Sequence, residues 1–74
     1  MLNLYQLQHL VAFAQAGTIS QAAQDLLLSQ PALTRSLQRL EEDLGVKLFE
    51  RQKNRTSLNE LGHYTVAKSS ARLP

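Results

Sequence analysis

Residues 29–45 read SQPALTRSLQRLEEDLG, and this stretch decides the fold that the rest of the chain must fit. Drawn as a helix, it carries one apolar stripe made of four leucines: Leu33, Leu37, Leu40 and Leu44. The opposite face is polar, with Arg35 and Arg39 ahead of the three acids 41–43 near its far end. A helix polarised along its axis in this way is expected to face different surroundings at its two ends.

The ends of this helix are marked by residues that suit helix termini. Ser29 is a good N-cap, and Pro31 adds to the start because its fixed φ and missing N–H are tolerated in a first turn. Gly45 can take the left-handed conformation that closes many helices. A helix is therefore predicted from about residue 30 to Leu44.

Two helices are predicted upstream. The first covers about residues 4–16, capped by Asn3 and stopped by Gly17, with an apolar stripe of Leu4, Leu7, Leu10, Val11 and Ala14. A short second helix follows Thr18, which forms a capping box with Gln21. Its expected buried side is Ile19, Ala22, Ala23 and Leu26, and the paired alanines let another helix backbone approach closely.

The chain turns extended beyond Gly45. Residues 48–50 and 56–58 are predicted to form a two-stranded hairpin around a basic, polar tip at residues 52–54. Asn59 can then cap a last helix, whose weak apolar side is Leu61, Tyr64, Ala67 and Ala71.

Length and composition restrict the kind of protein. The 74 residues suit one domain, and the lack of cysteine excludes disulfides and thiolate metal sites and points to a reducing cytoplasm. The longest apolar run, residues 10–14, is far shorter than the roughly 20 residues that cross a bilayer.

The charges are unevenly placed, although the formal net charge is only +2. Up to Thr34 the only formally charged side chain is Asp25, whereas residues 47–55 carry four basic side chains against Glu50 alone. A basic stripe on an otherwise neutral body favours a polyanionic partner, nucleic acid before membrane.

The predicted order of helix, helix, tight turn, helix and basic hairpin is that of a mainly α winged helix-turn-helix. Its helix-turn-helix motif is expected at about residues 19–38 and its wing at about 47–58. In that architecture the third helix enters the major groove of DNA with its N-terminus first. The acidic far end then points away from the phosphates.

Side-chain chemistry assigns roles on double-stranded DNA. Arg35 can donate two parallel hydrogen bonds to guanine, Gln30 or Gln38 can pair with adenine, and Thr34 and Pro31 can contact base edges or methyl groups. The start of the second helix, at Thr18, Ser20 and Gln21, can grip a phosphate. The wing adds salt-sensitive contacts through Arg51, Lys53 and Arg55.

The stretch AAQDLLLSQPALTRSLQRLEEDLGVKLFERQKNRTSLNELG, residues 22–62, resembles the N-terminal DNA-binding domain of LysR-type transcriptional regulators. The family pattern runs AAxxLxxSQPAxSxxIxxLExxLGxxLFxR and then LTxxG. The resemblance covers roughly residues 4–62 and implies that Gln30, Pro31, Thr34 and Arg35 face the groove and that Arg51 belongs to the wing. The mild departures are Thr34 for serine, Leu37 for isoleucine and Asn59 for threonine. The wing differs more, since Asn54 stands where an arginine is common and the charges here are Lys53 and Arg55. Leu27 stands where a polar residue is commoner, which predicts that Leu27 is exposed.

The resemblance also implies what the rest of such a protein does. Residues 1–62 would be the DNA-binding domain and residues 63–74 the truncated start of a linker helix, through which full-length members form homodimers or homotetramers. A small-molecule effector would bind only to a domain absent from this chain, and no cofactor is expected. The family reading implies a bacterial regulator of transcription that acts in the cytoplasm.

Other readings remain beside this one. A small helical protein-interaction or dimerisation module without DNA specificity has the same core, and Arg39 fits either a DNA contact or a surface pair with Glu42 or Asp43. His9 and His63 stand in no cluster with metal-ligand spacing, and no paired nucleophile and base is visible, so neither a metal site nor an enzyme is expected.

Overall fold

The computed structural model describes residues 4–52 and 55–72, so the expected cap Asn3 and the wing-tip residues Lys53 and Asn54 lie outside the described part. The expected elements are confirmed in type and order. They are α1 (Leu4–Ala16), α2 (Ile19–Leu26), α3 (Gln30–Leu44), β1 (Phe49–Gln52), β2 (Arg55–Leu58) and α4 (Glu60–Arg72).

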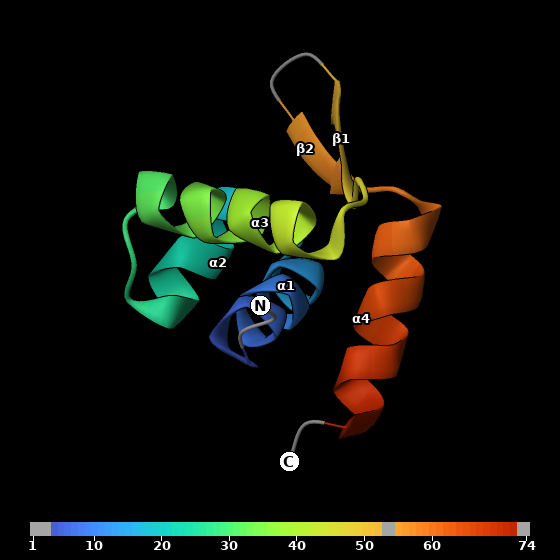
Figure 1. Ribbon diagram of the computed structural model, residues 1–74. Coiled ribbons are helices and arrows are strands. Elements are labelled where there is room, and N and C mark those ends of the chain that lie inside the picture. The colour runs from blue at the N-terminus through green and yellow to red at the C-terminus, as the bar shows by residue number, and fades with distance from the viewer. Residues whose placement is uncertain (1–3, 53–54, 73–74) are drawn as a thin grey trace.

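Helix α1 is the centre of the arrangement and contacts α2, α3 and α4 (Figure 1). Helix α3 crosses above α1, and the antiparallel β1–β2 hairpin projects past the C-terminal end of α3 as the wing (Figure 1). Helix α4 descends along the far side of α1. The outer face of α3 and one side of the wing are thereby left uncovered by the other helices.

One apolar core holds the helices together. The buried apolar side chains come from α1, α2 and α3 and from the residue before β1: Leu10, Phe13, Ala22, Ala23, Leu33, Leu37, Leu40 and Leu48. Val66 of α4 packs against them. The two alanines of α2 are buried as expected, because their small side chains let α2 lie close to its neighbours. The ring of Phe13 meets Phe49 of the wing edge-on, with 5.6 Å between centroids.

The predicted apolar stripes were partly wrong at the helix ends. Leu44 is 37% exposed and Leu4 is 57% exposed, whereas Gln6 and Phe13, which the stripe omitted, are buried. Periodicity gives the inner face of a helix but says nothing about where the covering helix stops. The last turn of α3 and the first turn of α1 therefore keep leucines at the surface.

The predicted caps hold, with one correction. The hydroxyl groups of Thr18 and Ser29 each accept a hydrogen bond from the backbone N–H three residues later. The donors are Gln21 N at 3.1 Å and Ala32 N at 3.2 Å. The reciprocal half of the capping box is wrong, since the Gln21 side chain donates to Asp25 at 2.9 Å instead. Asp25 lies one turn further along the same face, and its charged carboxylate accepts from the Gln21 amide, so this side chain is turned along the helix and not back to the N–H of Thr18.

Helix α2 ends on a leucine in the left-handed conformation. Leu27 has φ 59° and ψ 39°, and the N–H of Leu28 donates to Ala23 O at 2.8 Å, which closes the helix as Gly45 closes α3. Leu27 is also 92% exposed, as expected from its place in the pattern. A side chain with Cβ strains this conformation, and exposure gives Leu27 no burial to offset the strain.

Replacing Leu27 by glycine is expected to stabilise the fold. Glycine relieves strain of about 1–2 kcal/mol and loses about 0.4–1 kcal/mol through its freer unfolded chain, so a net gain of about 0.5–1 kcal/mol is predicted. Urea unfolding followed by circular dichroism measures the gain. Leu27→Ala keeps Cβ and is the matched control, expected to change the free energy of unfolding little. A loss of stability in the glycine variant would contradict this account.

The start of α4 is fixed against the base of the wing. Asn59 caps α4 as predicted, accepting from Gly62 N at 2.7 Å, and its own N–H donates to Leu48 O at 3.0 Å. A Cβ on Gly62 would overlap the carbonyl oxygen of Leu48, so α4 approaches the main chain just before β1 more closely than any side chain permits. The predicted apolar side of α4 is wrong in consequence: Gly62 and Val66 face the core, while Leu61 and Tyr64 are 41% and 60% exposed.

Candidate nucleic-acid interface

The outer face of α3 carries the residues that were predicted to read bases. Pro31 and Arg35 are exposed, as are Gln30 and Gln38, while Thr34 is half-buried. All five side chains line one shallow hollow on this face. None of the protein's described elements covers Pro31 or Arg35, so a partner as large as a DNA duplex can reach both side chains.

A second hollow, of about 490 Å³, joins three segments that are far apart in the sequence. The start of α2 contributes Thr18 and Ser20, the start of α3 contributes Gln30 and Thr34, and the wing contributes Arg51, Arg55 and Thr56. We call this hollow the α2–α3–wing groove. Among the described residues, Ile19 is its one apolar lining residue, and it shares Gln30 and Thr34 with the outer face of α3.

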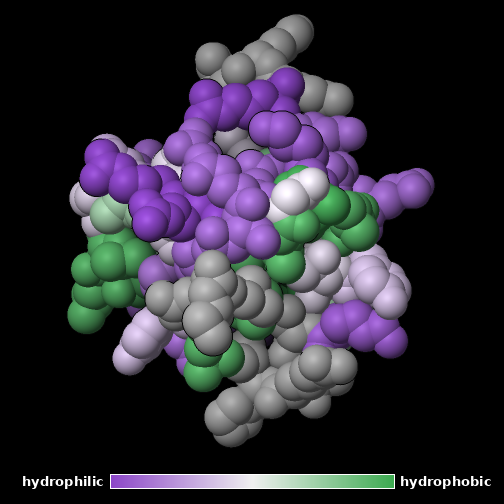
Figure 2. Space-filling model, in the orientation of Figure 1, coloured by the Kyte–Doolittle hydropathy of each residue, from purple (hydrophilic) through white to green (hydrophobic). Residues whose placement is uncertain are grey.

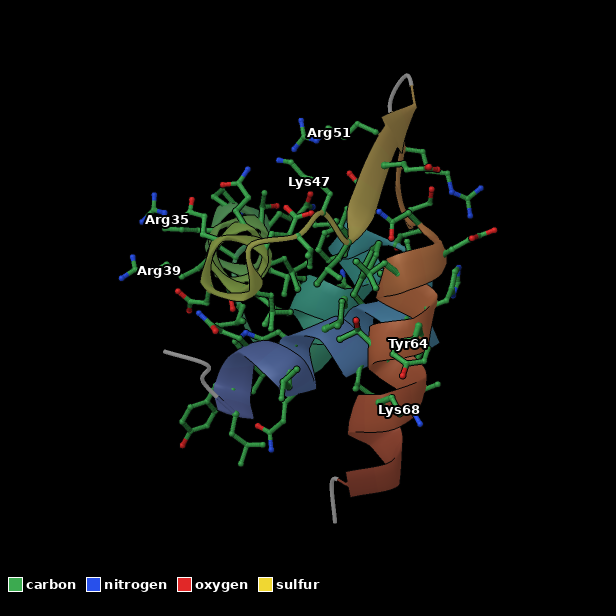
Figure 3. The ribbon with its side chains drawn as sticks, turned by 45° about the vertical axis from the view of Figure 1, so that its right-hand side comes forward. Arg35, Arg39, Lys47, Arg51, Tyr64 and Lys68 are labelled. Carbon is green, nitrogen blue, oxygen red and sulfur yellow. The ribbon has the colours of Figure 1, made fainter. Side chains whose placement is uncertain are left out.

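Four of the described basic side chains lie on the side of α3 and the wing (Figure 3). In Figure 3, Arg35 and Arg39 project from α3, and Lys47 and Arg51 lie above them at the base and edge of the wing, whereas Tyr64 and Lys68 lie on α4. Hydrophilic side chains cover α3 and the wing in the view of Figure 2. Lys47 was missed as a site residue, although its charge was noted, because its place beside Arg51 depends on the turn after Gly45. Lys53 falls outside the described residues.

The predicted contact at Gln21 is modified by the structure. Its backbone N–H is already bonded to Thr18 Oγ1 and its side chain to Asp25. The first-turn donors that a helix cannot bond internally and that Thr18 does not take are those of Ile19 and Ser20. Both residues line the α2–α3–wing groove, whereas Gln21 does not.

The acidic end of α3 contains a structural residue that sequence reasoning treated only as repulsive charge. The carboxylate of Glu41 accepts hydrogen bonds from Leu48 N at 2.8 Å and Phe49 N at 3.2 Å. Glu42 and Asp43 are exposed. No sequence pattern predicts this contact, because its donors are main-chain N–H groups, which every non-proline residue carries.

Another polar contact joins α1 to α3. Nδ1 of His9 lies 2.7 Å from Ser36 Oγ, one residue beyond Arg35. Burial lowers the pKa of His9 below its ordinary value, because desolvation disfavours the charged imidazolium. The hydrogen bond between the neutral His9 ring and the Ser36 hydroxyl therefore links α1 to α3.

The lowered pKa of His9 predicts that acid weakens the fold. Between the two pKa values the unfolded chain binds more protons than the folded chain, so the free energy of unfolding falls as the pH drops below about 6.5. Thermal unfolding measured near pH 7.5 and near pH 5.5 should give a lower Tm at the acidic value. His9→Gln should reduce this drop, and an equal drop in both proteins would assign it to other groups.

Two further observations concern the described residues only. None of their helices is long and apolar enough to cross a membrane. Among the same residues, no three histidine, cysteine or acidic side chains gather in a group that could hold a metal ion.

The chain is similar to known regulators over most of its length. The model of the lysR family of bacterial regulatory helix-turn-helix proteins matches residues 4–63. The HTH-type transcriptional regulator TfdT of Cupriavidus pinatubonensis (strain JMP 134 / LMG 1197) is 46% identical over 61 residues, which cover 82% of this chain and 27% of that protein. The uncharacterized HTH-type transcriptional regulator YybE of Bacillus subtilis (strain 168) is 42% identical over 66 residues, which cover 89% of this chain and 23% of that protein.

A solved structure shares the fold. The crystal structure of the CbnR_DBD-DNA complex matches with a TM-score of 0.87 and 38% identity, covering 95% of this chain and 80% of that chain. The chain therefore spans most of that structure but only about a quarter of the length of the two relatives, 27% and 23%.

Proposed function

Because the chain belongs to the lysR family of bacterial regulatory helix-turn-helix proteins, we propose that it binds double-stranded DNA sequence-specifically and regulates transcription. The observation that carries the proposal is the α2–α3–wing groove. The N-terminus of α2, the uncovered face of α3 and the basic wing meet in this groove, on one side of the molecule. A duplex laid on that side reaches all three segments at once, and the similar CbnR_DBD structure is of a DNA complex.

In the proposed pose the start of α3 enters the major groove. Arg35 donates its forked guanidinium to guanine O6 and N7, and Gln30 or Gln38 pairs with adenine. Thr34 and Pro31 contact base edges and the thymine methyl group. The exposure of this face in the free protein supports the pose, because no conformational change is needed to present it.

Phosphates are held on either side of the reading helix. The start of α2 offers the N–H groups of Ile19 and Ser20 together with the hydroxyl groups of Thr18 and Ser20, while Gln21 supports this turn from outside the groove. On the other side the wing offers Arg51 and Arg55, and the proposal includes Lys53, which lies between the two strands in the sequence. These contacts position the protein on the duplex without specifying its sequence.

We assign residues 1–62 to the DNA-binding domain and residues 63–74 to the start of a linker helix. The exposed Leu61 and Tyr64 of α4 support pairing of the longer protein through this helix, as a homodimer or homotetramer. Paired domains would contact half-sites about 34 Å apart, one helical turn, or a multiple of that spacing. An effector would act through a further domain, in a regulator without catalytic activity that works in the cytoplasm beside bacterial DNA.

Binding-site selection and salt titration test the proposal. Selection from a random duplex library should enrich one motif, and the affinity for it should fall steeply with salt, with a slope of log K against log salt of about −3 if roughly three phosphates are neutralised. The alternative, a helical protein-interaction module, predicts no enriched motif and a flat salt dependence. A flat titration on every duplex would refute DNA binding.

A further inference from the structure

The base of the wing is held from α3 by one side chain. Glu41, half-buried near the end of α3, accepts two main-chain hydrogen bonds with the same oxygen, Oε2, from Leu48 and Phe49. Phe49 is the first residue of β1, and Arg51 follows two residues later in the same strand. The carboxylate therefore fixes the point from which the wing leaves the body.

The same short segment is held from its other side by the start of α4. Asn59 donates its side-chain amide to Lys47 O at 2.9 Å and its backbone N–H to Leu48 O at 3.0 Å. Leu48 itself is fully buried in the core. The main chain of residues 47–49 is thus held by α3 through its N–H groups and by α4 through its carbonyl groups.

The acidic end of α3 was expected to point away from the phosphates, but Glu41 lies beside the proposed interface, where an acid is unfavourable for DNA binding. It lines a hollow between α3 and the wing together with Thr34, Gln38 and Arg51, all of which belong to the proposed interface. A negative charge there repels phosphate, so its presence calls for a compensating role. The two hydrogen bonds supply one, since charged acceptors bind main-chain N–H groups more strongly than neutral ones do.

We propose that Glu41 is a positioning residue of the DNA interface: its carboxylate sets the wing at the distance from α3 that lets Arg51 and the base-reading face of α3 engage one duplex together. The inference rests on the proposed function. Glu41 touches no base or phosphate in this account and acts through the position of Arg51.

Three substitutions separate position from charge. Glu41→Asp keeps the charge but withdraws the oxygen by one methylene, about 1.5 Å. Glu41→Gln removes the charge but leaves one oxygen at the same reach, and because a single oxygen makes both bonds, it can preserve them. Glu42→Gln is the matched control, since it removes the same charge from the neighbouring, exposed residue.

The readout on DNA is the salt slope with and without Arg51. In the wild-type protein, Arg51→Ala should flatten the slope by about 1. In the Glu41→Asp background, Arg51→Ala should change the salt slope by less than half of its effect in the wild type. The reason is that the displaced wing has already lost the contact between Arg51 and a phosphate. With Glu41→Gln or Glu42→Gln the full effect of Arg51→Ala should remain. If instead Glu41→Asp behaved as wild type and both glutamine variants bound all duplexes more tightly, Glu41 would act by charge alone and the proposal would be wrong.

A second measurement needs no DNA. The chain lacks cysteine, so Arg39→Cys and Glu50→Cys place spin labels only on exposed sites of α3 and β1. The label-to-label distance distribution should shift or broaden with Glu41→Asp and stay unchanged with Glu41→Gln. An unchanged distribution in the aspartate variant overturns the positioning role even if the wild type binds DNA. Failure of the wild type to bind any duplex refutes the proposed function while this measurement still decides whether Glu41 places the wing.

Discussion

Arg35→Ala is expected to reduce discrimination at one base pair of the selected motif by about 1–3 kcal/mol, which is roughly 5- to 150-fold in relative affinity. Arg35 is exposed on the outer face of α3, next to Pro31 and Gln38 in the same hollow. A guanidinium in the major groove donates to two acceptors of a single guanine, and no other base pair offers both in that geometry. Competition binding against duplexes substituted at each position of the motif measures the effect.

Arg39→Ala is the matched control for this prediction. It removes an exposed arginine one helical turn further along α3, further from the leading end of the helix. It should lower the affinity for all duplexes equally or not at all, with the preference for the motif retained. If Arg35→Ala also weakened every duplex to the same extent, Arg35 would be a phosphate contact and its assignment to a base would be wrong.

Leu33→Ala is expected to cost about 2–5 kcal/mol of folding free energy, through lost burial and the cavity left behind. Leu33 is fully buried in the core, beneath the face of α3 that is proposed to read bases. A domain of this size has a total stability of roughly 5 kcal/mol, so the variant should be largely or wholly unfolded at room temperature. Circular dichroism and urea unfolding report the loss directly.

Leu44→Ala tests the same stripe at its exposed end. Both leucines lie on the inner face of α3, but Leu44 is 37% exposed, so its removal leaves a smaller cavity and should cost about 1 kcal/mol or less. Equal losses from the two substitutions would show that α3 is covered along its whole length, contrary to the structure.

The features that could be predicted from the sequence are those with local causes. The order of the elements, the caps at Thr18, Ser29 and Asn59, and the stop at Gly45 all depend on a side chain and a backbone group within a few residues. The outward face of α3 follows from helical periodicity, and the basic wing from the sequence itself. Most of the candidate site could therefore be identified in advance as a set of residues.

The faces of the terminal helices were less predictable. In α1 the sequence placed Leu4 on the buried stripe and omitted Phe13, and in α4 it placed Leu61 and Tyr64 inside where Gly62 and Val66 lie. Hydropathy favours large apolar residues for the inner face. Contact between α4 and the base of the wing instead requires a residue without Cβ. The helix therefore places the face with Gly62 and Val66 against the body, and Leu61 and Tyr64 remain exposed.

By itself, the sequence determined which segments become helices or strands and which side chains stand on the polar face of the third helix, since both depend on spacing along one segment. Only the tertiary structure decided that the start of α2, the start of α3 and the wing form one groove, and that Glu41 holds the main chain of residues 48–49. The reason is that main-chain donors and acceptors are the same at nearly every residue. Which of them meet is set by how the helices pack, and their pairing leaves no pattern in the sequence.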